Sequence, residues 1–160
     1  MSKRKSWHEK LADSKGLPKV TMLCGKMRDH FGSGTMVIPA PSEVDAIMKK
    51  VPKGKLITIS EIRSILAQRH GATMTCPITA GIFAWIAAHA AEEAEAAGVT
   101  KITPYWRTLK SGGELNAKYP GGIARLRKRL EAEGHCVIAK GKRFVVADFE
   151  KRLVASSVCT

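Results

Sequence analysis

The chain has 160 residues, 44% of them hydrophobic, which suits one domain with a core of its own. A formal net charge of +13 favours a polyanionic partner such as nucleic acid, with a merely soluble basic protein as the alternative. No apolar stretch approaches the ~18 residues of a membrane-spanning helix, and the four cysteines form no Cys-x-x-Cys pair. The sequence therefore argues against a membrane segment, a disulfide framework and a zinc site.

Residues 1–41 are expected to form a helical extension that packs on the core. Residues 6–14 predict a short helix, Gly16-Leu17-Pro18 a break, and residues 21–31 a second, weakly patterned helix. Residues 35–41 predict an extended lead-in bounded by prolines. This end of the chain is basic, with eight Lys and Arg against three acidic residues in positions 1–30.

The next segment predicts a helix, a strand and a second helix. Ser42 is a suitable N-cap for a helix with one apolar stripe, formed by Val44, Ile47, Met48 and Val51. Residues 56–59 are β-branched and short enough for a strand, after which Ser60 is expected to cap a helix that ends at Gly71. This order is typical of the opening of a winged helix.

A long helix is predicted from Pro77 to the residues before Gly98, in the position of a recognition helix. Its start contains Thr79, Ala80 and Gly81, whose small size would allow the backbone to approach DNA closely. The alternative is that these residues only permit tight helix packing. Three glutamates near its end are unfavourable for the helix dipole and for DNA, so that end is expected to point away from nucleic acid.

The last third of the chain carries thirteen Lys and Arg against five acidic residues, counted over positions 101–160. Residues 99–103 and 107–109 predict short strands, and a helix is expected from residues 120–122 to Gly134, with Arg125, Lys128 and Arg129 outside. Residues 136–139 and 143–147 predict a β-hairpin, and Asp148 caps a last short helix. The hairpin tip carries Lys140, Lys142 and Arg143. The basic residues of the predicted helix and those of the hairpin tip could hold DNA phosphates from two directions. The alternative is that the helix residues form an ordinary solvated face.

The predicted fold is α+β, mainly α, with a winged helix-turn-helix arrangement. We expect three parts: the extension at residues 1–41, a DNA-binding domain at residues 42–135, and a hairpin with a short helix at residues 136–160 that belongs to the same domain. No heptad pattern is present, so a monomer is expected, without a cofactor or metal and in the cytoplasm.

Four segments, in this order along the chain, resemble motifs of the alkylguanine-DNA alkyltransferases, the methylated-DNA-cysteine methyltransferase family. They are Val51-Pro-Lys-Gly-Lys-Leu-Ile-Thr-Ile-Ser-Glu-Ile62, Pro104-Tyr105-Trp106-Arg107, Tyr119-Pro-Gly-Gly-Ile-Ala124 and Leu130-Glu-Ala-Glu-Gly134. The second segment resembles the family's Pro-Cys-His-Arg. The resemblance covers roughly residues 42–135 and implies the family's DNA-binding domain.

The resemblance also implies that the family's chemistry is lost. Tyr105 stands in place of the nucleophilic cysteine and Trp106 in place of the histidine that activates it. A phenol with a pKa near ~10 stays protonated at neutral pH, and indole has no basic nitrogen. By resemblance the pocket would comprise Pro104, Tyr105, Trp106, Arg107 and Glu133, which matches the family's glutamate. Tyr105 would either wall a base pocket or fill it; ordinary core packing is the alternative.

Two further departures from the family concern base flipping. The position of the family's tyrosine corresponds to about Ile59 here, and the position of its base-displacing arginine corresponds to Thr79 or Ala80. We therefore predict a non-catalytic, alkyltransferase-like protein that binds double-stranded DNA, senses alkylated guanine and acts with excision-repair proteins. One alternative is an active DNA alkyltransferase or other thiol enzyme that uses Cys76, at a helix start. Another is a nucleic-acid or protein-interaction module that retains only the fold.

Overall fold

The computed structural model describes residues 3–155 of the chain. Its α-helices are α1 (Trp7–Ala12), α2 (Gly25–Phe31), α3 (Pro41–Lys49), α4 (Ile59–Arg69), α5 (Pro77–Ala96) and α6 (Gly122–Ala132). Its strands are β1 (Lys19–Met22), β2 (Thr35–Ile38), β3 (Ile57–Thr58), β4 (Met74–Thr75), β5 (Thr108–Leu109), β6 (Val137–Lys140) and β7 (Arg143–Val146). Short 3-10 turns cover Tyr105–Arg107, Ser111–Gly113 and Phe149–Arg152. This mixture of helices and small sheets confirms the predicted α+β class.

The N-terminal extension contains strands as well as helices. The predicted first helix is α1, which begins after the N-cap Ser6 in a capping box with Glu9. The predicted helix over residues 21–31 is wrong in its first half, because β1 occupies residues 19–22 and only α2 is helical. β1 pairs antiparallel with β2, and β2 pairs parallel with β4, so long-range pairing outweighs the weak helical pattern.

α3 begins two residues earlier than predicted. Pro41 takes the first helical position and Ala40 is the N-cap, whose backbone N–H donates to the Glu43 carboxylate at 3.0 Å. The prediction that Ser42 caps this helix is therefore wrong, since the return bond from Glu43 and the proline set the start. The predicted apolar stripe is buried as expected, including Val51 after the helix.

α4 also starts earlier than predicted. Its N-cap is Thr58 rather than Ser60: the Thr58 hydroxyl accepts from the Glu61 N–H, and the Glu61 carboxylate accepts from the Thr58 N–H at 3.1 Å. β3 is consequently only two residues long, and it pairs parallel with β5. That pairing joins the segment before α4 to the segment that follows Arg107.

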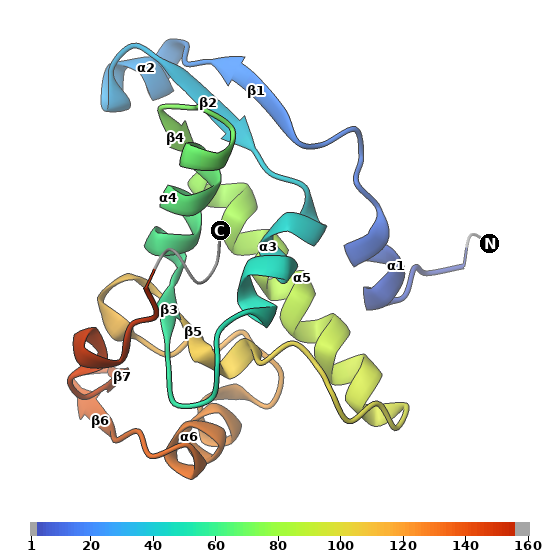
Figure 1. The fold of residues 1–160 in the computed structure, drawn as a ribbon, viewed down its shortest axis with the longest axis vertical. Helices are drawn as coiled ribbons and strands as arrows, with labels where there is room; N and C mark the ends of the chain where they lie inside the picture. Colours follow the sequence, from blue (N-terminus) through green and yellow to red (C-terminus); the bar gives the residue numbers. More distant parts are fainter. Residues whose placement is uncertain (1–2, 156–160) are drawn as a thin grey trace.

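α5 runs through the centre of the molecule, with α3 and α1 along it and α4 near its start (Figure 1). α4, β4 and α5 follow one another as helix, short strand and helix. Buried alanines along α5, including Ala84, Ala87, Ala88 and Ala91, permit close packing in the core. At its other end, α1 lies against α5, because Trp7 stacks on His89 with ring centroids 4.4 Å apart.

The C-terminal hairpin is confirmed, with β6 and β7 paired from Val137–Val146 to Lys140–Arg143 around a turn at Gly141. A bridge joins Glu114 to Val145, so β7 also lies beside the segment after β5. The strand predicted at residues 99–103 is absent, since those described residues form no strand. No helix of residues 3–155 is both long and apolar enough to cross a bilayer.

Candidate nucleic-acid interface

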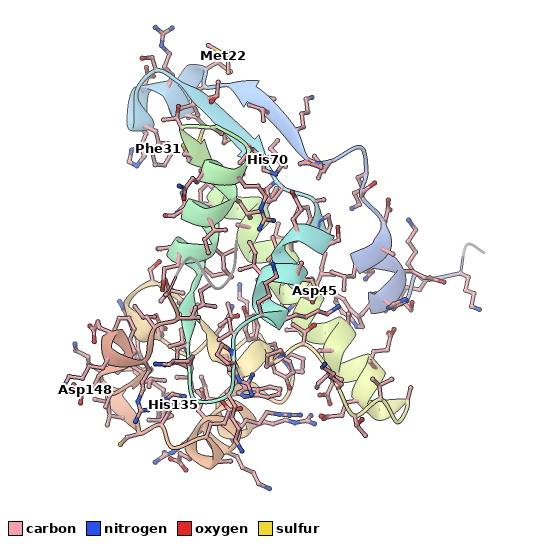
Figure 2. The ribbon with its side chains drawn as sticks, viewed as in Figure 1. Met22, Phe31, Asp45, His70, His135 and Asp148 are labelled. Carbon is pink, nitrogen blue, oxygen red and sulfur yellow. The ribbon has the colours of Figure 1, made fainter. Side chains whose placement is uncertain are left out.

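Pro104 to Arg107 forms a tight turn that packed neighbours hold in place. The turn begins after Pro104 and leads directly into β5. Just before it, the Thr103 hydroxyl donates to the buried Asp45 of α3 at 2.7 Å; Asp45 is labelled in Figure 2. The motif is therefore positioned by α3 on one side and by β3 on the other.

Tyr105 is a core residue in this structure, with 0% of its surface exposed. Its ring packs edge-on against Trp106 and Tyr119, at centroid distances of 5.4 and 6.0 Å. Burial raises the pKa of Tyr105, and its hydroxyl has no hydrogen-bond partner among residues 3–155. The geometry is that of a side chain that fills interior space, so Tyr105 has no exposed surface to present to a base.

Glu133 anchors three of the four motif segments. Arg107 donates from Nε and Nη2 to its carboxylate at 3.0 and 2.6 Å, and Trp106 Nε1 donates at 3.0 Å. Arg107 Nη1 also donates to the Val51 carbonyl at 2.7 Å, and the Gly54 N–H lies 3.5 Å from Glu133. Both side chains of the ion pair are largely buried, 14% and 7% exposed. The arginine–glutamate pair thus has a structural role.

The electrostatics of Glu133 follow from this arrangement. Burial raises the pKa of Glu133, but the hydrogen bonds from Arg107 and Trp106 and the guanidinium charge more than offset burial. The pKa of Glu133 therefore lies below its usual value. An ionised carboxylate accepts bonds here and cannot donate a proton at neutral pH.

Three of the other four predicted pocket residues line a shallow surface cleft, and Glu133 does not. Pro104, Trp106 and Arg107 border a cavity of about 340 Å³ on the side of α3 and the end of α5. Tyr105 is not among its lining residues. Arg129 covers part of the cleft, with its guanidinium 4.5 Å from the Trp106 ring centroid.

The arginines of α6 are engaged by the acidic end of α5. Arg125 forms ion pairs with Glu92 and Glu95, and Arg129 pairs with Glu95 at 2.6 Å. Arg125 and Arg129 were predicted to lie mostly outside; both are part-exposed, but their guanidiniums turn toward α5. Lys128 is exposed and forms no ion pair with any described residue, as predicted for it.

At the start of α5, the three predicted contact residues differ in exposure. Ala80 is 0% exposed and faces the core, which corrects its prediction as a DNA contact. Thr79 and Gly81 are half-buried, and the Thr79 hydroxyl donates to the Cys76 carbonyl. The exposed side chains of this stretch are Ile78 and Ile82, at 69% and 45%.

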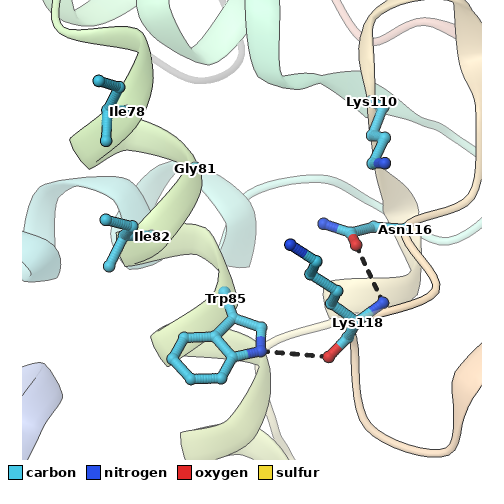
Figure 3. Close-up of a pocket in the computed structure, with 7 residues that line it drawn as sticks. All are labelled: Ile78, Gly81, Ile82, Trp85, Lys110, Asn116 and Lys118. Carbon is cyan, nitrogen blue, oxygen red and sulfur yellow. Dashed lines mark hydrogen bonds between the residues drawn. The ribbon is translucent and has the colours of Figure 1, made fainter.

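A groove lies between the start of α5 and the segment after β5 (Figure 3). Its volume is about 420 Å³. We name it the α5 groove; its lining residues are Ile78, Gly81, Ile82, Trp85, Lys110, Asn116 and Lys118. Trp85 Nε1 donates to the Lys118 carbonyl at 3.1 Å, and the Lys118 N–H donates to Asn116 Oδ1 at 3.0 Å. These bonds fix one lip of the groove to the helix that forms the other.

The lysines of this groove carry no signal in the sequence that marks them as part of a site. Lys110 and Lys118 lie 33 and 41 residues beyond Pro77, the start of α5, in a segment with little regular structure, so no local pattern relates them to the helix. Only the tertiary structure places this segment between α5 and the hairpin, with the Leu115 N–H donating to the Phe144 carbonyl at 2.9 Å and the Lys118 carbonyl accepting from Trp85.

The C-terminal hairpin lies beside the segment that supplies the groove lysines. The bridge between Glu114 and Val145 is antiparallel, so the chain from Glu114 toward Lys118 runs toward the tip of the hairpin. Lys140, Lys142 and Arg143 at that tip are exposed and form no ion pair with a described residue. The α6 arginines, by contrast, pair with α5 about 20 Å further along that helix than the groove, at 1.5 Å per residue.

Cys76 and His135 have no arrangement suited to nucleophilic or metal chemistry. Cys76 is buried at the N-cap of α5. His135 is buried and Cys136 exposed, as expected for neighbours that face opposite ways, and burial lowers the pKa of His135. Within residues 3–155, no three His, Cys, Asp or Glu side chains gather as metal ligands.

No protein-family model and no curated protein matches this chain. Among solved structures, the chain is similar to the crystal structure of S. pombe Atl1, an alkyltransferase-like protein, in complex with damaged DNA containing O6-carboxymethylguanine. The two chains are 20% identical with a TM-score of 0.47, and the match covers 72% of this chain and 94% of the Atl1 chain.

Proposed function

We propose that this protein binds double-stranded DNA through the α5 groove and the hairpin tip, without transferring an alkyl group. The observation that carries the proposal is the α5 groove, which is lined by exposed isoleucines at the start of a helix and by two lysines on the opposite lip. Phosphates would contact the lysines, and the isoleucines would contact sugars or base edges.

The free cations of this surface support an electrostatic attraction to DNA. Lys118 forms no ion pair with a described residue, and Lys110 lies 4.0 Å from the Glu114 carboxylate, a weak exposed pair. Each phosphate that a cation neutralises releases counterions from the duplex, which makes binding dependent on salt. The chain's net charge of +13 acts in the same direction.

The first prediction concerns the salt dependence of DNA binding. Replacing Lys110 and Lys118 with alanine should weaken binding and reduce the slope of log K against log salt by about 2, since each phosphate contact contributes roughly 0.9. Fluorescence anisotropy of a labelled duplex at several salt concentrations measures both effects. As a control, Lys26→Ala removes an exposed charge on α2 and should leave the slope unchanged. An unchanged slope in the double variant would refute this interface.

The finer proposal, supported by the sequence resemblance, is that the protein senses alkylated guanine and marks it for an excision-repair protein. A duplex with one alkylated guanine should then bind more tightly than the same duplex without it. Equal affinities would leave general DNA binding and remove lesion sensing. Equal competition by RNA would favour the alternative of a general nucleic-acid module.

The second prediction is that no alkyl group reaches the protein. Tyr105 and Trp106 occupy the motif, and Cys76 is buried at the helix start. After incubation with duplex that carries an alkylated guanine, the intact mass should equal that of untreated protein. Alkylation of the unfolded chain by a thiol reagent serves as the control that its cysteines are detectable. An adduct on Cys76 would support the alternative of a thiol enzyme.

A further inference from the structure

The acidic end of α5 and the basic face of α6 form one ion-pair cluster. Glu95 contacts two arginines, with its Oε1 3.2 Å from Arg125 Nη2 and 2.6 Å from Arg129 Nη2. Glu92 pairs with Arg125 through the other terminal nitrogen. We name these four residues the α5–α6 cluster.

The glutamates of this cluster stand where helix electrostatics disfavour them. They lie in the last two turns of α5, where the dipole places partial negative charge, and the last turn holds no basic residue. Glu92 also keeps one buried oxygen without a partner among the described residues. Neither feature stabilises the helix. The ion pairs with the α6 arginines therefore offset the unfavourable position of these carboxylates.

The arginines have the position expected of phosphate-binding side chains. They lie on one face of α6 with Lys128, along a surface hollow of about 610 Å³ lined by Ala124, Arg125, Lys128, Arg129 and Ala132. Arg125 is 38% and Arg129 21% exposed in their side chains, so DNA could reach both groups if the carboxylates released them. A guanidinium already paired with a carboxylate releases few counterions on meeting a phosphate.

We propose that Glu92 and Glu95 prevent α6 from binding DNA and so confine the duplex to the α5 groove and the hairpin tip. The inference rests on the proposed function. Under it, the two glutamates determine where DNA binds: neutralising them gives the protein two additional phosphate contacts, at Arg125 and Arg129.

The test is a set of matched variants, measured by anisotropy titrations of an undamaged duplex over a range of salt. The double variant Glu92→Gln, Glu95→Gln keeps the shape of both side chains and one acceptor oxygen in each while removing their charge. Its slope of log K against log salt should be steeper by about 2, with tighter binding at low salt. Thermal unfolding of the variant establishes that the fold persists.

Two further variants separate released arginines from a general gain of charge. Asp29→Asn with Glu150→Gln removes two exposed carboxylates that form no ion pair among the described residues, and it should leave the slope near that of the wild type. Arg125→Gln with Arg129→Gln should change little in the wild type but should abolish the gain in the Glu92, Glu95 variant.

The outcomes distinguish this inference from the proposed function. If the wild type shows salt-dependent binding but the Glu92, Glu95 variant has the same slope, the inference is wrong and DNA binding stands. An equal gain in the Asp29, Glu150 control would also overturn it, because charge alone would explain the effect. A wild type that fails to bind duplex at low salt would refute both.

Discussion

Tyr105→Ala is expected to lower the free energy of unfolding by about 3 to 5 kcal/mol, the loss typical of a large aromatic side chain removed from a core. The wild-type ring is 0% exposed and contacts the rings of Trp106 and Tyr119, so its removal would leave a cavity beside the motif turn. Chemical denaturation, followed by circular dichroism at equilibrium, measures the loss.

Tyr105→Phe is the matched control for this variant. It keeps the packed ring and removes a hydroxyl that has no partner among the described residues, so stability should stay within about 1 kcal/mol of the wild type or rise. A loss in Tyr105→Phe as large as in Tyr105→Ala would mean that the hydroxyl makes an essential bond. A negligible loss in Tyr105→Ala would contradict its place in the core.

Arg107→Ala is expected to destabilise the fold by about 3 to 5 kcal/mol, the range seen when one partner of a buried ion pair is removed. The variant would leave the Glu133 carboxylate, 7% exposed, without its principal donor, and would also remove the bond to the Val51 carbonyl. Urea denaturation gives the change. Arg127→Ala is the control. It breaks the exposed ion pair between Arg127 and Glu131, both on α6, and should change the free energy of unfolding little.

The Arg107 effect should also depend on pH. The folded-state pKa of Glu133 lies below its ordinary value near 4.5, so its ionisation stabilises the fold fully above that value. This contribution is lost as pH falls through the lower, folded-state pKa. The difference in stability between wild type and Arg107→Ala should therefore be largest above pH 5 and shrink in more acidic solution. A difference independent of pH would show that the guanidinium acts only through packing.

The resemblance grouped Trp106 and Arg107 with Glu133, and these side chains are hydrogen-bonded; it made no prediction about Val51 or Gly54. The segments at Val51 to Gly54, Trp106 to Arg107 and Glu133 are far apart in sequence, and the Glu133 carboxylate joins them through hydrogen bonds. The resemblance did not predict how Tyr105 packs. A tyrosine in a tight turn can face inward or outward with the same local sequence, and only its neighbours settle which.

Element boundaries differed from the predictions for local reasons. α3 and α4 each begin earlier than their predicted serine caps, because Glu43 and Glu61 reach back to the preceding backbone N–H. β1 was predicted as helix, since four residues carry little periodic signal and the strand exists through pairing with β2.

Short-range patterns were sufficient for the long helix α5, the stripe of α3, the helix α6 and the hairpin around Gly141, because periodicity and turn residues act over a few positions. Contacts between distant segments account for the rest. They bury Tyr105 and Ala80, bring Lys110 and Lys118 to the start of α5, and pair the α6 arginines with Glu92 and Glu95. Whether a charge is free or neutralised depends on what lies within a few ångströms in space, and neighbours along the chain do not reveal that.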